Sequence, residues 1–220
     1  MSKYISWPSI KKYLPLLLTV YLPPIILIVI LGVIAKLTNI PTMDFFDDPS
    51  QIVGYDYYIG LVNNLGIIIW AATMGICIFT FFILRRTDGN GGLAKFLLFS
   101  GLLTLILLID DFFLIHEWLY DYTSEFIVPV VFLILFILLV FRFRKIILDT
   151  DYIFLIAAIV FFGISLVLDV LQSRVVIISG GVRTLMEDGC KLLGIISWLT
   201  YFARTGLAEL RSPTDVSRDT

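Results

Sequence analysis

Six apolar stretches of roughly 20 residues recur along this chain, and they limit what it can fold into. A helix of about 20 apolar residues crosses the roughly 30 Å of hydrocarbon in a bilayer. A composition of 59% hydrophobic and 15% charged residues, with a mean hydropathy of +0.98, also argues against a soluble domain. We therefore predict an all-α bundle of six transmembrane helices. The stretches are residues 13–37, 58–84, 93–116, 126–141, 152–172 and 184–204.

A length of 220 residues leaves room for one such bundle. We expect a single transmembrane domain at residues 1–205 and a short, polar, disordered tail at residues 206–220. The first stretch is too long for the core of a signal peptide and ends without a small-residue cleavage site, so we expect it to remain as a membrane helix. Pro23 and Pro24 in its middle predict a kink, because proline removes a backbone donor and crowds the preceding turn.

Positive charges concentrate in alternate connections, and this pattern indicates the orientation of the chain. Lys and Arg in short loops are retained in the cytoplasm. Most cations lie in four segments: before the first stretch, between the second and third, between the fourth and fifth, and after the sixth. These cations are Lys3, Lys11, Lys12, Arg85, Arg86, Lys95, Arg142, Arg144, Lys145, Arg204, Arg211 and Arg218. The opposite loops hold fewer cations and an acidic segment at residues 44–56. We therefore predict a multi-pass integral membrane protein with both termini in the cytoplasm.

Two adjacent carboxylates, Asp110 and Asp111, interrupt the third stretch, and the one histidine of the sequence, His116, follows them. Moving a carboxylate into hydrocarbon costs on the order of 3 kcal/mol, so acidic residues at such depth usually face a protein interior or a wet cavity. This pair is therefore the first candidate for a functional site.

Polar residues on other stretches are predicted to lie at the same depth, because successive helices run in opposite directions. At about 1.5 Å rise per residue, they fall within roughly 5–12 Å of the outer ends of their helices. They are Asn63, Asn64, Asp110, Asp111, Asp169, Glu187, Asp188 and Lys191, and Gln172 shares a helix face with Asp169. Because convergence of polar groups in a concavity is the usual form of a binding site, we predict one shared pocket in the extracytoplasmic half of the bundle.

Helical phase indicates which of these side chains can cooperate, since residues three, four or seven apart share a face. Lys191 shares a face with Glu187 and with Asp188, so we expect one of these acids to be its direct partner. Asp110 shares a face with Glu117.

Asp111 lies about 100° around the helix from Asp110, so we expect it to reach a neighbouring helix. His116 lies about 140° from Asp111, and a straight helix therefore places the histidine poorly for chelation with either aspartate.

The first of three functions open for this pocket is hydrolysis. A divalent metal would polarise an ester or amide of a lipid-like substrate and activate a bound water. The candidate catalytic residues are Asp110, Asp111, Glu187 and Lys191, the candidate pocket residues are Asn63, Asn64, His116, Gln172 and Asp188, and the candidate metal ligands are Asp110, Asp111, Glu117 and Asp169. Their oxygen atoms suit magnesium, calcium or manganese better than zinc.

The second function is a cation- or proton-coupled transporter or channel, in which the acids form a relay. The third is a structural or assembly subunit, in which the polar groups make satisfied contacts between helices. The expected partners are membrane lipid and a small lipid-like or ionic ligand. No basic patch or stacking motif favours nucleic acid, and the oligomeric state is open.

The asparagine pair Asn63-Asn64 and the acidic pair Asp110-Asp111 resemble the layout of alkaline-ceramidase-like membrane hydrolases. That family builds a zinc site from several histidines. This chain has one histidine, and Glu187 and Lys191 stand where a late histidine pair would be needed. The resemblance therefore transfers neither zinc nor catalytic residues.

The two cysteines, Cys77 and Cys190, are predicted to be free thiols. They lie roughly 28 Å and 10 Å from the outer face, far beyond the roughly 7 Å between Cα atoms that a disulfide allows.

Overall fold

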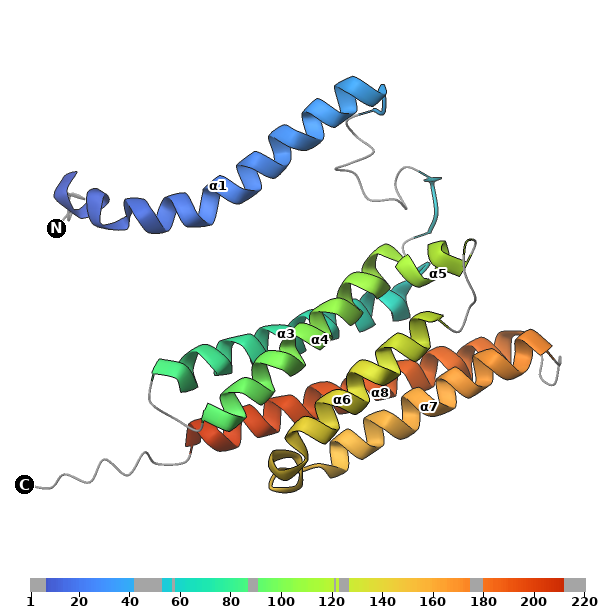
Figure 1. Ribbon diagram of the computed structural model, residues 1–220. Coiled ribbons are helices and arrows are strands. Elements are labelled where there is room, and N and C mark those ends of the chain that lie inside the picture. Colours follow the sequence, from blue (N-terminus) through green and yellow to red (C-terminus); the bar gives the residue numbers. More distant parts are fainter. Residues whose placement is uncertain are drawn as a thin grey trace, which may run out of the picture. The chain divides into compact units, whose positions relative to one another are not determined.

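The computed structural model describes residues 7–41, 53–56, 58–86, 91–120, 122, 127–174 and 180–211. Within these residues the fold is all-helical, as predicted, and has seven helices (Figure 1). They are α1 (Trp7–Thr38), α3 (Leu61–Arg86), α4 (Gly91–Phe113), α5 (Ile115–Tyr120), α6 (Ile127–Leu148), α7 (Ile153–Arg174) and α8 (Gly180–Arg211). Each predicted stretch therefore corresponds to one long helix, and α5 is an additional short one. Most of the predicted acidic loop lies outside the described residues.

The chain divides into two compact units, residues 1–59 and 60–220. The first unit contains α1, which continues without a break through Pro15, Pro23 and Pro24. Its ribbon is curved along its length rather than sharply kinked (Figure 1).

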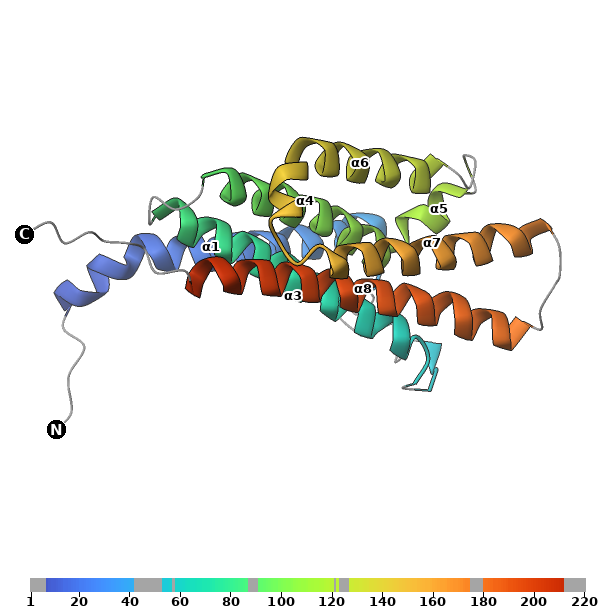
Figure 2. The ribbon, with the colours of Figure 1, turned by 90° about the horizontal axis from the view of Figure 1, so that it is seen from below.

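The second unit is a helical bundle in which α3 packs along both α4 and α8 (Figures 1 and 2). α8 also packs along α7, and α6 contacts α4. Since α3, α4, α7 and α8 have no proline, each can satisfy its backbone hydrogen bonds along its whole length, which a helix in hydrocarbon requires.

Four helices are long and apolar enough to cross a membrane: α1 over Tyr21–Thr38, α3, α4 and α6. α7 has a shorter apolar segment, Ile153–Asp169, and α8 carries charged residues in its first half. These findings are consistent with an integral membrane protein.

Several helix boundaries differ from the predicted ones, chiefly in α4, α6 and α8. α4 ends at Phe113 instead of continuing to residue 116. α6 extends beyond residue 141 to Leu148, with a change of direction at Phe143, whose φ of −118° and ψ of 18° are not helical. α8 begins earlier and continues to Arg211, past the point where we predicted a disordered tail to start.

An aromatic layer fills the centre of the bundle. The ring of Trp70 lies 5.9 Å from Phe162 and 6.2 Å from Trp198, between ring centroids. The indole N–H of Trp198 donates to Oγ1 of Thr104 at 3.1 Å. These four side chains come from α3, α7, α8 and α4, so the contacts join four helices of the bundle. Both cysteines are free, as predicted.

Candidate functional site

The site begins where α4 ends. Leu114 has a φ of +51°, a left-handed conformation that L-residues seldom adopt. This residue ends α4 after Phe113 and starts α5 at Ile115 in a new direction. The chain consequently folds back on the last turn of α4.

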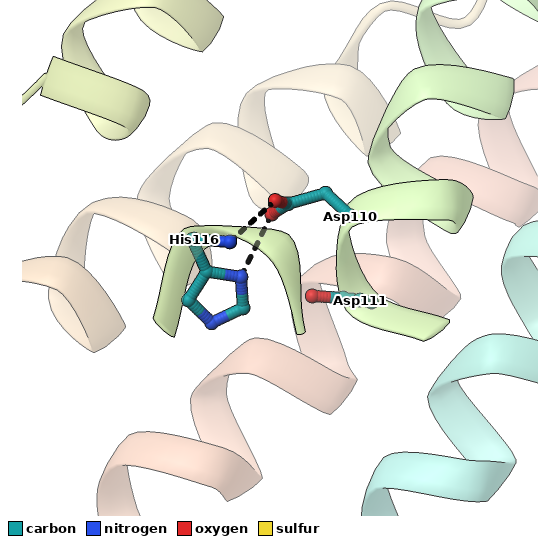
Figure 3. A group of neighbouring side chains, drawn as sticks. All are labelled: Asp110, Asp111 and His116. Atoms are coloured by element: carbon teal, nitrogen blue, oxygen red, sulfur yellow. Dashed lines mark hydrogen bonds and ion pairs between the residues drawn. The ribbon is translucent and has the colours of Figure 1, made fainter. Parts of the chain in front are cut away.

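This reversal brings His116 to Asp110, as Figure 3 shows. The backbone N–H of His116 donates to Oδ1 of Asp110 at 3.0 Å, and its Nδ1–H donates to Oδ2 at 2.9 Å. The prediction that the histidine is poorly placed to meet an aspartate was wrong, because it assumed a straight helix through Leu114. The expected common face of Asp110 and Glu117 fails for the same reason.

The hydrogen bond with Asp110 raises the pKa of His116 above its ordinary value, and partial burial offsets some of this effect. Because Nδ1 is engaged with Asp110, the second ring nitrogen, Nε2, points away from that carboxylate (Figure 3). A carboxylate that fixes the tautomer and orientation of a histidine in this way prepares its other nitrogen for proton transfer or metal binding.

Asp111 is buried and reaches two neighbouring helices, as predicted from its helical phase. Its Oδ1 accepts from Nζ of Lys191 on α8 at 2.9 Å. Its Oδ2 accepts from the indole N–H of Trp70 on α3 at 2.9 Å. The ion pair of Lys191 with Asp111 thus joins α8 to α4. We had expected Lys191 to pair with Glu187 or Asp188 on its own helix.

A small cavity of about 60 Å³ lies beside this ion pair. Its polar lining is Asn63, Asp111, Asp188 and Lys191, and its apolar lining is Val62, Gly66, Leu192 and Ile195. Three of the four helices from which we predicted polar groups in one layer, α3, α4 and α8, therefore meet here. The volume accommodates a few waters or one small polar group, and is too small for an acyl chain.

The remaining predicted residues lie outside this group. Asn64, Glu117 and Asp169 are exposed. Glu187 is half-buried, and its side chain or backbone is engaged in a further contact. The side chain of Gln172 lies outside the described part of the structure.

Trp70 was missed as a site residue, although the sequence contains a signal for it. Asn63, Gly66 and Trp70 are spaced by three and four residues, which places them on one face of a helix. An indole N–H on the face of a polar residue is a candidate donor to any buried carboxylate opposite.

Among the described residues, Asp110, Asp111 and His116 form one group that could hold a metal ion, since each offers a ligand atom within 4.8 Å of the other two. This spacing suits a shared divalent ion. However, every carboxylate oxygen of the two aspartates already accepts a hydrogen bond, and the ammonium of Lys191 adds positive charge. Each oxygen keeps a second lone pair, so a metal would share these oxygens with their present donors and would lie near the positive charge of Lys191.

A family model described as a domain of unknown function, DUF8692, matches residues 22–205. The match covers more than half of the chain, so the chain belongs to this family. No curated protein and no solved structure matches it. Its function has to be argued from the site itself.

Proposed function

We propose that this family member crosses the membrane six times, with residues 1–205 as the transmembrane domain and both termini in the cytoplasm. The ion pair between Lys191 and Asp111 supports a spanning α8, because a paired charge loses less free energy in a bundle than an isolated one. The site then lies in the extracytoplasmic half.

Cysteine labelling tests this topology. In a background with Cys77 and Cys190 replaced, a probe that cannot cross the membrane should label single cysteines placed at Asp47, Asp121 and Gly180. It should miss those placed at Asn90 and Thr214. Labelling of the Asn90 position from outside would contradict the orientation.

We further propose that the protein is a membrane-embedded hydrolase of a lipid-like ester or amide. The observation that carries this proposal is the double contact between Asp110 and His116 next to Asp111, a lining residue of the polar cavity. A nitrogen of His116 lies within 4.8 Å of a carboxylate oxygen of Asp111, which lines that cavity.

The chemistry requires only groups that this site contains. Nε2 of His116 takes a proton from water as the water oxygen attacks the carbonyl carbon. The ammonium of Lys191 stabilises the negative charge that develops on the carbonyl oxygen. His116 then returns the proton to the leaving alcohol or amine as its bond to the carbonyl carbon breaks. The small cavity holds the carbonyl group, and the acyl chain lies outside it along the apolar helix surface.

The aromatic layer is the reason to prefer a hydrolase to a transporter. Trp70, Trp198 and Phe162 pack together on the inner side of the ion pair. A site that is accessible from one side and closed by packed rings on the other suits binding and chemistry better than passage.

A metal-assisted form of the same hydrolysis is a second candidate, because of the spacing of Asp110, Asp111 and His116. These three residues would hold magnesium, calcium or manganese, and the ion would supply Lewis acidity. Activity that is lost with a chelator and restored by manganese would favour this form over the metal-free one.

The test is fatty-acid release from a total lipid extract by the purified full chain in nanodiscs, followed by mass spectrometry. His116→Gln should lower the rate by about 100-fold or more, because general base catalysis typically contributes that much. Asp110→Asn should lower it as well. Asp149→Asn, an exposed acid at the other end of the bundle, is the matched control and should leave the rate unchanged. Absence of turnover by the wild type, or equal turnover by His116→Gln, would contradict the proposal.

A further inference from the structure

A second, larger cavity lies at the opposite end of the bundle from the site. Its volume is about 470 Å³, within the range of small-molecule sites. It lies between the start of α4 and the last part of α6. Its lining residues are Gly91, Gly92, Lys95, Phe141, Arg142, Phe143, Arg144, Lys145 and Ile146.

The cavity lies at the change of direction in α6, and Phe143 at that point is one of its lining residues. The Phe143 side chain is buried, with its ring centroid 5.4 Å from that of Phe96 and 6.0 Å from that of Phe99 on α4. This packing holds the non-helical backbone in place. Arg144 and Lys145 follow directly, so the turn presents them to the start of α4.

Four cations line this cavity: Lys95, Arg142, Arg144 and Lys145. All four are exposed. The structure gives none of them an ion pair with any carboxylate among the described residues. Arg142 has one ring contact, with its guanidinium carbon 5.4 Å from the centroid of Phe143. Concentrated positive charge of this kind favours an anionic ligand.

We propose that this cavity binds the phosphate headgroup of an anionic phospholipid. Arginine presents planar donors that match phosphate oxygens, and basic cavities between membrane helices are suited to such headgroups. The proposal rests on insertion of the chain in a membrane. It is independent of hydrolase activity, so the two can fail separately.

The apolar surface beside the cavity favours a lipid over free phosphate. Phe141, which lines the cavity, is 70% exposed, and Leu138, one turn earlier on α6, is 60% exposed. These side chains share a helix face, so an acyl chain can extend along them from a bound headgroup.

Thermal unfolding of the full chain in neutral detergent tests the proposal. Dioctanoyl phosphatidylglycerol should raise Tm in a saturable way, and dioctanoyl phosphatidylcholine should not. Inorganic phosphate should have little effect at the same concentration. Equal binding of phosphate and phosphatidylglycerol would overturn the assignment to a lipid, and no binding of phosphatidylglycerol would overturn the site.

A pair of matched double variants separates a built site from diffuse surface charge. Arg144→Gln/Lys145→Gln should weaken phosphatidylglycerol binding about 30-fold, from about 1 kcal/mol for each cation near a lipid surface. Arg85→Gln/Arg86→Gln removes the same charge from the end of α3, outside the cavity, and should change binding by less than about threefold. Equal losses in the two would overturn the proposal. If the first variant does not fold, Lys95→Gln on α4 and Arg86→Gln take the place of the two double variants; Lys95→Gln should weaken binding about fivefold, and equal losses in the two would overturn the proposal.

Discussion

Removing the carboxylate of Asp111 should destabilise the protein more than any other single change at the site. Truncating one partner of a buried ion pair leaves an uncompensated charge and typically costs roughly 3–5 kcal/mol. The side chain of Asp111 is 11% exposed and that of Lys191 is 36% exposed, so screening moves the expected cost to the lower end. We expect Asp111→Leu to lower the free energy of unfolding by about 3 kcal/mol.

The double variant Asp111→Leu/Lys191→Met should recover only part of this loss, because it removes both charges but leaves one donor unpaired. The indole N–H of Trp70 then lacks its acceptor, which costs about 1–3 kcal/mol. Unfolding in mixed micelles by added dodecyl sulfate, followed by circular dichroism, measures these free energies for both single variants and the double variant.

Asp188→Asn is the matched control, since Asp188 is exposed and lies one turn from Lys191 on the same helix. It should cost less than about 1 kcal/mol, as exposed pairs do. A large loss for Asp188→Asn together with a small one for Asp111→Leu would refute the pairing across helices. Strictly additive effects of the two single variants would refute it too.

Further changes test the local geometry. Leu114→Gly should keep the contact between Asp110 and His116, since glycine adopts the left-handed region without strain. Leu114→Pro should abolish this contact, because proline fixes φ near −65°; the histidine NMR resonances distinguish the two variants. Gly194→Ala should lower the free energy of unfolding by about 1–3 kcal/mol, because its Cβ would lie 2.6 Å from a ring carbon of Phe162, while Gly163→Ala meets no atom and should not destabilise. The pKa of His116, which faces Asp110, Asp111 and Lys191, is raised in the folded protein. The protonated histidine therefore stabilises the fold fully below its unfolded pKa of about 6.5, and this stabilisation is lost as the pH rises through its folded pKa. Unfolding by urea or dodecyl sulfate at pH 6 and pH 9 should show this loss in the wild type and not in His116→Gln.

The long helices were predictable from the sequence because apolar length alone determines them. The interruption of α4 was not. Leu114 adopts a left-handed conformation in a run of large apolar residues, with no glycine, asparagine or proline to indicate a turn. Tertiary contacts offset the strain at Leu114, including the hydrogen bond that the backbone N–H of His116 donates to Asp110.

The partner of Lys191 illustrates a second limit of sequence patterns. Helical phase identifies neighbours on one helix, such as Asp188, but contains no information on which face of another helix lies opposite. The direction of Asp111 was predictable, since it lies about 100° from Asp110. That α8 and α3 both lie on that side follows only from the packing of the bundle.

The ion pair connects the proposal that α8 spans the membrane to the proposed site. α8 carries Asp188 and Lys191 in its first half and is not among the four helices that are long and apolar enough to cross a membrane. In the bundle, the charge of Lys191 is matched by Asp111 from α4, and α8 packs along α3 and α7 like its apolar neighbours. In the proposed topology, the same contact would reduce the cost of placing Asp111 in a membrane. Each of the two residues would then lower the cost of the other at that depth, so replacing either one alone would leave the other charge unpaired.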